Sequence, residues 1–143
     1  MGGPAMIDGV VYPVTDNFLH CKFVVLNKEY CSSENYFQCM KARNEEDHEK
    51  LRRCGPGMDV WVASRKIHLR QDWEKVKVRV MHQANLNKFA QNPEFMKTLV
   101  GTKGPIHMGN GFWPRWNARI LTRIRAELRQ NGEEDDMTIK TVE

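Results

Sequence analysis

The fold is decided by residues 32–42, which read Ser32-Ser33-Glu34-Asn35-Tyr36-Phe37-Gln38-Cys39-Met40-Lys41-Ala42. The two serines stand where a helix N-cap belongs, and an acid follows in the first turn, where acids are favoured. Glu34, Gln38 and Lys41 are spaced i, i+4 and i+7, so they share one helix face. A carboxylate, an amide and an amine on one face form either a solvated ion-pair surface or the floor of a site.

The rest of the chain predicts more helix than strand. Residues 10–12 and 21–26 are β-rich runs, and a turn at Asn27-Lys28 leads into Tyr30. Helices are expected over residues 33–43, from a cap at Asn44 to Gly55, over 58–65 as a short helix or turn, over 72–90 and 93–100, and after Gly111 with Pro114 at the first helical position. A further short strand is expected at 106–108. These elements predict an α+β fold, dominated by helices, with a small β-sheet.

The length of 143 residues suits one domain, which we expect to span residues 7–131. The opening residues 1–6 resemble an appended leader. Residues 132–143 are acidic and poor in apolar side chains, so a disordered tail is expected there.

Several classes of protein are disfavoured by the sequence. We find neither an apolar run long enough to span a membrane nor a signal peptide, and the four cysteines lack CxxC spacing. They are typical of free thiols in an intracellular protein, cytoplasmic or nuclear. The histidines show no paired helical spacing and the glycines form no phosphate-binding motif, so we expect neither a metal nor a cofactor.

The last part of the chain is basic and aromatic. The net charge is +4, and residues 115–129 hold five arginines against one acid, Glu127. This charge is compatible with nucleic acid or phosphate ligands. Phe112-Trp113-Pro114-Arg115-Trp116-Asn117 either stacks on a base and holds phosphate, or anchors the last helix to the core through its tryptophans.

Several segments taken together resemble the NADAR superfamily, which is named for its association with NAD and ADP-ribose metabolism. The resemblance covers residues 10–130 and depends on the order and spacing of these blocks: Thr15-Asp16-Asn17-Phe18, Phe23-Val24-Val25-Leu26, Ser33-Glu34-Asn35-Tyr36-Phe37-Gln38 with Lys41, Leu69-Arg70-Gln71-Asp72-Trp73, Val80-Met81, Lys88-Phe89-Ala90-Gln91-Asn92, Leu99, Thr102, Phe112-Trp113, Asn117, Leu121 and Ile124-Arg125.

The resemblance implies an N-glycosidase. Family members cleave phosphoribosylated intermediates of riboflavin biosynthesis or remove ADP-ribose from guanine in nucleic acid. For this chain it implies ADP-ribose or ADP-ribosylated guanine in nucleic acid as the ligand, no membrane partner, and a role opposite an ADP-ribosyltransferase. Glu34 matches the family glutamate and Lys41 the family lysine, so both are expected to be catalytic.

Further residues are expected to bind substrate. They are Asn17, Phe18, Gln38, Arg70, Asn110, Trp113, Trp116 and Asn117. Three departures from the family pattern fall where the family places part of its pocket: Asn110 stands where an aspartate is usual, Ile106-His107-Met108 replaces an acidic position, and the loop after Trp113 is short. These departures leave open a non-catalytic module that binds ADP-ribose, and an enzyme acting on riboflavin intermediates.

Overall fold

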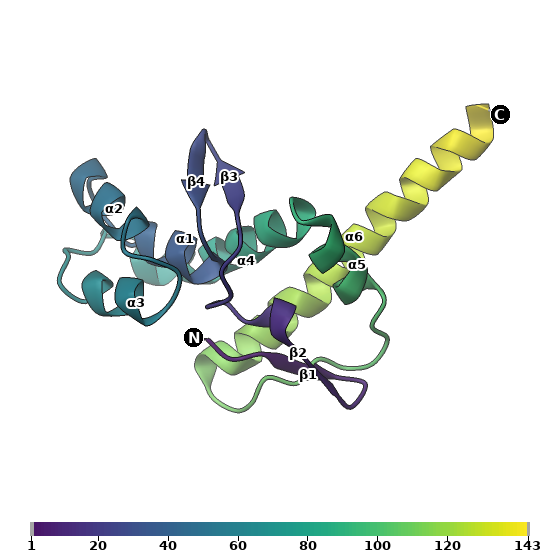
Figure 1. The fold of residues 1–143 in the computed structure, drawn as a ribbon, viewed down its shortest axis with the longest axis horizontal. Coiled ribbons are helices and arrows are strands. Elements are labelled where there is room, and N and C mark those ends of the chain that lie inside the picture. The colour runs from purple at the N-terminus through teal and green to yellow at the C-terminus, as the bar shows by residue number, and fades with distance from the viewer. Residues whose placement is uncertain (1, 143) are drawn as a thin grey trace.

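The computed structural model describes residues 2–142, and the side chains of residues 2–130. Within this described part, six α-helices and two antiparallel two-stranded sheets form an α+β structure (Figure 1). The helix-rich α+β class expected from the sequence is confirmed. The strands form two separate hairpins in place of one small sheet.

Both hairpins close through two residues with positive φ. Strand β1 (Ala5–Ile7) pairs with β2 (Val10–Tyr12). Strand β3 (Phe23–Val25) pairs with β4 (Lys28–Tyr30), and the turn between them has φ of 50° at Leu26 and 66° at Asn27. The turn expected at residues 27–28 therefore lies one residue earlier, because a two-residue hairpin loop of this kind needs positive φ at both central positions.

The first hairpin is bound to a loop about a hundred residues later in the chain. Met6 and His107 exchange backbone hydrogen bonds of 2.8 and 3.0 Å, and the Asp8 carboxylate accepts bonds of 2.9 and 2.8 Å from the N–H groups of Lys103 and Gly104. The strand expected at 106–108 is reduced to this isolated bridge. Ala5 is fully buried, so residues before 7 pack on the domain, although an appended origin for residues 1–6 stays a prediction.

The helices begin close to where the sequence places them. After the 3₁₀ turn η1 (Pro13–Thr15) come α1 (Ser33–Cys39), α2 (Glu45–Arg52), α3 (Met58–Ser64), α4 (Trp73–Ala90), α5 (Pro93–Val100) and α6 (Phe112–Val142). The cap of α2 is Asn44, whose side chain accepts a 2.8 Å bond from the N–H of Asp47. Helix α6 begins two residues before Pro114, which is tolerated because first-turn positions lack an intrahelical N–H partner. The expected tail from residue 132 has side chains outside the described part, so that expectation stays a prediction.

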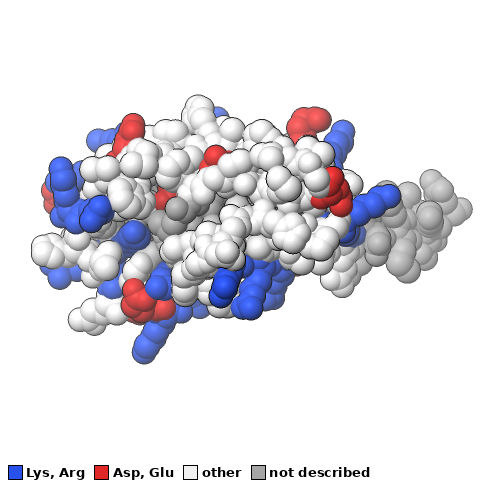
Figure 2. All heavy atoms as spheres, turned by 90° about the horizontal axis from the view of Figure 1, so that it is seen from below, with Lys and Arg blue, Asp and Glu red and all other residues white. Residues whose placement is uncertain are grey.

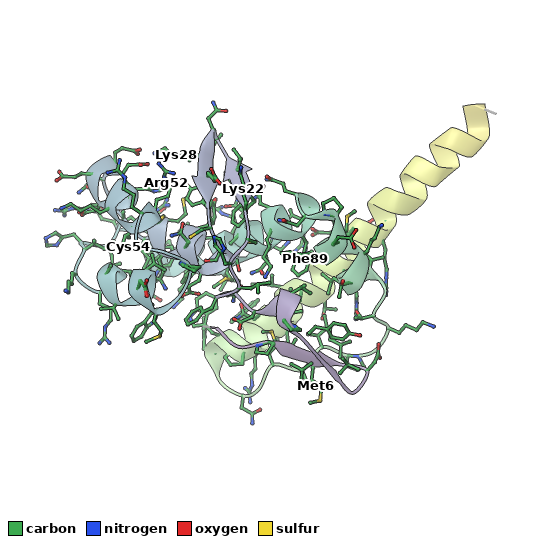
Figure 3. The ribbon with its side chains drawn as sticks, in the orientation of Figure 1. Met6, Lys22, Lys28, Arg52, Cys54 and Phe89 are labelled. Carbon is green, nitrogen blue, oxygen red and sulfur yellow. The ribbon has the colours of Figure 1, made fainter. Side chains whose placement is uncertain are left out.

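The core lies around α4, which packs against α1 on one side and α6 on the other. Phe89 of α4, Phe37 of α1 and Ile124 of α6 are all buried. Figure 3 shows Phe89 within the helical layer and Met6 at the surface of the first hairpin. No helix in residues 2–142 is long and apolar enough to cross a bilayer.

Candidate active site

Helix α1 is buried along its whole length even though four of its seven residues are polar. Its N-cap, Ser32, accepts a 2.9 Å bond from the N–H of Asn35 and donates a 2.7 Å bond to the carbonyl of Pro56. The Asn35 amide in turn donates to the carbonyls of Leu51, Arg52 and Gly55. These bonds fix the start of α1 against the segment that joins α2 to α3.

Glu34 and Gln38 form a buried polar pair inside this helix. The Gln38 amide donates a 2.6 Å bond to Oε1 of Glu34, and both side chains are 0% exposed. Oε2 of Glu34 and Oε1 of Gln38 have no hydrogen-bond partner among the described residues. Buried oxygens without partners are costly in a folded protein, so they mark where a ligand or a water would bind.

Burial raises the pKa of Glu34 above its ordinary value, while the hydrogen bond from Gln38 and the charge of Lys41 act in the opposite direction. Desolvation is therefore the largest influence on this carboxyl. A raised pKa suits a carboxylate that accepts and returns a proton.

Lys41 lies two residues beyond the end of α1, which stops at Cys39 and not at the expected residue 43, and its side chain is half-buried. Its Nζ lies 5.6 Å from the ring centre of Phe37 and 5.9 Å from that of Trp73. Burial lowers the pKa of Lys41, Glu34 opposes the shift, and the positive charge of Lys77 adds to it. Lys41 is thus a cation held on aromatic faces, with an amine that loses its proton more readily than an exposed lysine.

A buried asparagine pair holds the start of α1 in place. The carbonyl of Asn17 accepts a 3.0 Å bond from the N–H of Glu34, and its Oδ1 accepts bonds of 2.8 Å from Ser33 and 3.0 Å from Nδ2 of Asn85. The expected residue Asn17 therefore positions Glu34 directly. Asn85 is not among the residues expected from the sequence, although an asparagine in the apolar stripe of Met81 and Phe89 was a usable signal.

Phe18 and the late aromatic residues approach α1 from other parts of the chain. The Phe18 ring lies against two glycines, and a Cβ at Gly2 or Gly57 would come within 2.9 or 3.2 Å of it. Trp113 of α6 packs edge-on against Phe37, with ring centres 5.0 Å apart. Asn117 is buried one turn later, and its Oδ1 has no hydrogen-bond partner among the described residues.

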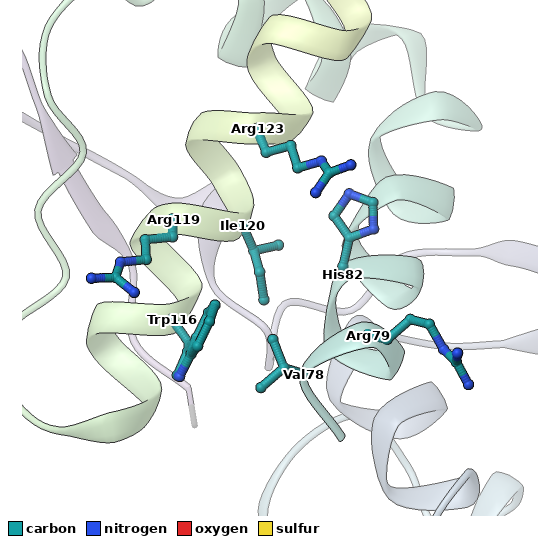
Figure 4. Close-up of a pocket in the computed structure, with 7 residues that line it drawn as sticks. All are labelled: Val78, Arg79, His82, Trp116, Arg119, Ile120 and Arg123. Carbon is teal, nitrogen blue, oxygen red and sulfur yellow. The ribbon is translucent and has the colours of Figure 1, made fainter. Parts of the chain in front are cut away.

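Three of the expected residues lie apart from Glu34. Arg70 forms an ion pair with Asp72 through bonds of 2.6 and 3.0 Å, although its backbone N–H donates to the carbonyl of Lys41. Asn110 is exposed and lines a shallow hollow of about 370 Å³ before α6. Trp116 lines a hollow of about 510 Å³ between α4 and α6 (Figure 4). Within the described part of the chain, no three His, Cys, Asp or Glu side chains come together as a metal site would require.

Comparisons with known proteins agree on one family. The NADAR domain family matches residues 10–107. The N-glycosidase YbiA of Escherichia coli (strain K12) is 36% identical over 91 residues, which cover 60% of this chain and 55% of YbiA. The riboflavin biosynthesis protein VVA0006 of Vibrio vulnificus (strain YJ016) is 29% identical over 130 residues, covering 81% of this chain and 35% of that protein.

The fold has a solved counterpart. The NMR structure of E. coli YbiA superposes with a TM-score of 0.74 at 28% identity, covering 85% of this chain and 81% of that chain. The chain spans about half the length of the curated N-glycosidases that it matches.

Proposed function

The chain belongs to the NADAR domain family, and on that premise we propose that it is an N-glycosidase which hydrolyses the bond between ribose C1 and a base nitrogen. The observation that carries the proposal is the buried carboxylate of Glu34, with one oxygen held by Gln38, the other without a partner in the described part, and Lys41 close enough to affect its protonation. A purely structural helix has little use for this combination, because each buried polar group adds a desolvation cost.

The chemistry follows from the bond that breaks. As the C1–N bond lengthens, positive charge develops on the ribose, and a nearby carboxylate stabilises it. Glu34 takes a proton from the attacking water, the water oxygen bonds to C1, and the departing base nitrogen ends protonated. The raised pKa of Glu34 favours this proton transfer, since a general base works best when its pKa approaches the ambient pH.

Lys41 has two alternative roles in this scheme. As an ammonium group it binds a phosphate of the substrate or stabilises the ionised form of Glu34. As a free amine it attacks C1 itself, so that a C1–Nζ bond forms, the bond to the base breaks and the base leaves with a proton from the amine. The ribose ring then opens at its C1–O bond to give an imine, which water hydrolyses to free the sugar and the amine. The lowered pKa of Lys41 increases the share of free amine and so favours the second role, whereas the charge of Glu34, which opposes the shift, favours the first.

For the substrate we propose ADP-ribosylated guanine in nucleic acid, with release of ADP-ribose. The arginine-rich start of α6 supports this choice, because a nucleic-acid substrate brings phosphates beyond the scissile sugar. A second candidate is a phosphoribosylated intermediate of riboflavin biosynthesis. The name and the 130-residue match of the V. vulnificus relative favour it.

The test is a direct assay of both substrates. The protein is incubated with oligonucleotides carrying ADP-ribosylated guanine, and separately with phosphoribosylated riboflavin intermediates, and the released sugar is measured by mass spectrometry. Release of ADP-ribose supports the proposed substrate, and release of a ribose phosphate from the second set shifts the function to the riboflavin candidate. Binding of ADP-ribose without release from either set would leave a non-catalytic module and overturn the proposed enzyme.

A further inference from the structure

A groove on the outer side of α4 and α6 is not part of the Glu34 site. The hollow of about 510 Å³ has a floor of apolar side chains between the two helices, and basic groups rise around it (Figure 4). Its lining is Val78, Arg79, His82, Trp116, Arg119, Ile120 and Arg123. A second hollow of about 370 Å³ continues it toward the start of α6, lined by Gly111, Phe112, Arg115, Trp116 and Arg119.

Three arginines line up along this groove. Arg115, Arg119 and Arg123 are exposed and are spaced four residues apart on α6, so successive guanidinium groups arise about 6 Å apart along the helix. Arg123 forms an ion pair with Glu127 at 2.9 Å. Neither Arg115 nor Arg119 forms an ion pair with any carboxylate in the described residues, and Arg79 across the groove also lacks one. Figure 2 shows basic side chains gathered along the lower margin of the face seen from below.

Aromatic rings alternate with these cations. The guanidinium of Arg119 lies 5.2 Å from the ring centre of Trp116, and Trp116 lies 6.4 Å from Phe112. Phe112 is 50% exposed and carries the ammonium of Lys77 at 4.7 Å from its ring centre. Trp116 is half-buried and Phe112 exposed. Accessible rings interleaved with cations are the arrangement by which proteins bind single strands, because bases stack on the rings while phosphates meet the cations.

A path of ring contacts joins the groove to the helix that carries Glu34. Phe112 packs against Trp113 at 5.2 Å, and Trp113 packs against Phe37 at 5.0 Å. Phe37 lies under the ammonium of Lys41. The charge of Lys77 is also close enough to Lys41 to contribute to the lowering of its pKa.

We propose that this groove binds single-stranded nucleic acid, with phosphates on Arg115, Arg119 and Arg123 and a base stacked on Trp116 or Phe112. A single strand fits better than a duplex, because an unpaired base offers its face to an exposed ring whereas a duplex offers only base edges in its grooves. The inference rests on the proposed function in one respect: the strand would deliver its modified guanine along the aromatic path to Glu34.

The test measures strand binding without cleavage. A fluorescein-labelled, unmodified 20-nucleotide single strand of mixed sequence is titrated with the full chain between 50 and 200 mM salt, and anisotropy is recorded. We expect the slope of log affinity against log salt to be about −0.7 for each phosphate contacted, hence near −2 for three arginines. The triple variant Arg115→Gln, Arg119→Gln, Arg123→Gln should weaken binding at least about tenfold at 50 mM salt and flatten the slope.

A matched triple variant removes the same charge elsewhere. Arg53→Gln, Arg65→Gln and Lys66→Gln neutralise three exposed cations near α2 and α3, and Arg65 lies 5.0 Å from the ring centre of Trp61 much as Arg119 lies over Trp116. The affinity of this control variant for the strand should fall by less than about twofold, because its three charges lie outside the proposed contact. A strand of equal length without bases should bind more weakly than the normal strand, since it cannot stack.

Three results would overturn the proposal: no binding by the wild type at 50 mM salt, an equal loss in the control triple, or equal affinity for the strand without bases. Circular dichroism verifies that each variant is folded. If the α6 triple does not fold, the single variant Arg119→Gln must still reduce the salt slope by about 0.7. Because no bond is cleaved in this assay, strand binding by an inactive protein would reject the proposed function alone, and hydrolysis without strand binding would reject the groove alone.

Discussion

Gln38 holds Oε1 of Glu34 at 2.6 Å from one helical turn away, and this bond makes the two oxygens of the carboxylate unequal. Oε1 is committed to the amide, whereas Oε2 has no partner in the described residues. A buried carboxylate anchored at one oxygen is held in one orientation, which is what a group that acts on a substrate at the other oxygen requires. The chemistry proposed for Glu34 therefore depends on Oε2.

Glu34→Gln should keep the fold and ligand binding but lower turnover by at least about two orders of magnitude. A glutamine retains an oxygen for the Gln38 amide but replaces the basic oxygen with an amide nitrogen. The measurement is kcat together with ADP-ribose binding by calorimetry. Glu46→Gln, at an exposed first-turn position of α2, is the control and should leave turnover unchanged. Equal turnover in Glu34→Gln and wild type would remove Glu34 from the chemistry.

Replacing Lys41 separates its two possible roles. Lys41→Met should reduce turnover or binding strongly in either role, whereas Lys41→Arg keeps the charge but cannot form an imine. Borohydride added during turnover should trap a covalent adduct on Lys41 if the amine attacks C1, and mass spectrometry of the digested protein locates it. The exposed Lys66→Met is the control, since an exposed charge contributes only about 0–1 kcal/mol. Full activity in Lys41→Met would place this lysine outside the site.

Turnover should fall on the acid side as Glu34 takes up a proton, and Gln38→Leu should move that fall to higher pH. The hydrogen bond from Gln38 lowers the pKa of Glu34 against the larger effect of burial, so its removal lets the pKa rise further. The profile of kcat against pH gives the shift directly. Gln83→Leu, on the exposed side of α4, should leave the profile in place. A shift of the acid limb to lower pH in Gln38→Leu would contradict the assigned role of the amide.

Asn85→Ala should destabilise the protein by about 1–3 kcal/mol, because it removes a buried donor and leaves Oδ1 of Asn17 with one bond fewer. It should also lower turnover, since Asn17 holds the N–H of Glu34. The free energy of unfolding from urea titration and kcat are the two readouts. Asn87→Ala, at a less buried position of the same helix, is expected to cost less than about 1 kcal/mol. Equal losses in the two variants would show that the buried asparagine pair has no special role.

Lys88 should make stability depend on pH in the alkaline range. Its side chain is 0% exposed and donates a 3.1 Å bond to the carbonyl of Asp16, and burial lowers its pKa from 10.5 to about 8. The folded state loses this proton before the unfolded state does. The contribution of the Lys88 titration to the free energy of unfolding is therefore full above pH 10.5 and is lost as the pH falls through about 8.

Between those limits, the unfolding free energy of the wild type should rise relative to Lys88→Met by up to roughly 3 kcal/mol. Urea unfolding at a series of pH values measures the difference. Lys75→Met, exposed on the same helix, should run parallel to the wild type. A constant difference between wild type and Lys88→Met across this range would mean that Lys88 titrates alike in both states.

The helices were predictable from the sequence because their signals are local. Asn44 as a cap, Pro93 at a helix start and the glycines after α2 and α5 each act within one or two turns. The first hairpin was harder to predict from the sequence. Strand β1 pairs with β2 across the turn, and it also pairs with residue 107, far along the chain. The turn at Leu26-Asn27 was displaced by one residue because a leucine with positive φ is rare and sequence gives no cue for it.

The site was predictable in part for the same reason. Glu34 and Gln38 share α1, so their spacing alone places them on one face, whereas Lys41 lies two residues beyond the end of the helix. The asparagine pair joins residues 17 and 85, and the Phe37–Trp113 contact joins α1 to α6, so both depend on packing between distant segments. Trp116 and Trp113 are three residues apart on one helix, yet the first lines the outer groove and the second faces Phe37.

The bond pattern between Met6 and His107 has a consequence for how the chain folds during synthesis. The hairpin is synthesised before the residues that pair with Met6 and Asp8, which follow about a hundred positions later. At about 5–20 residues per second, the exposed edge of β1 waits several seconds for its partner. Slowing translation near residue 100 would lengthen the time for which this edge is available to other nascent chains, whereas the cap of α1 could form long before.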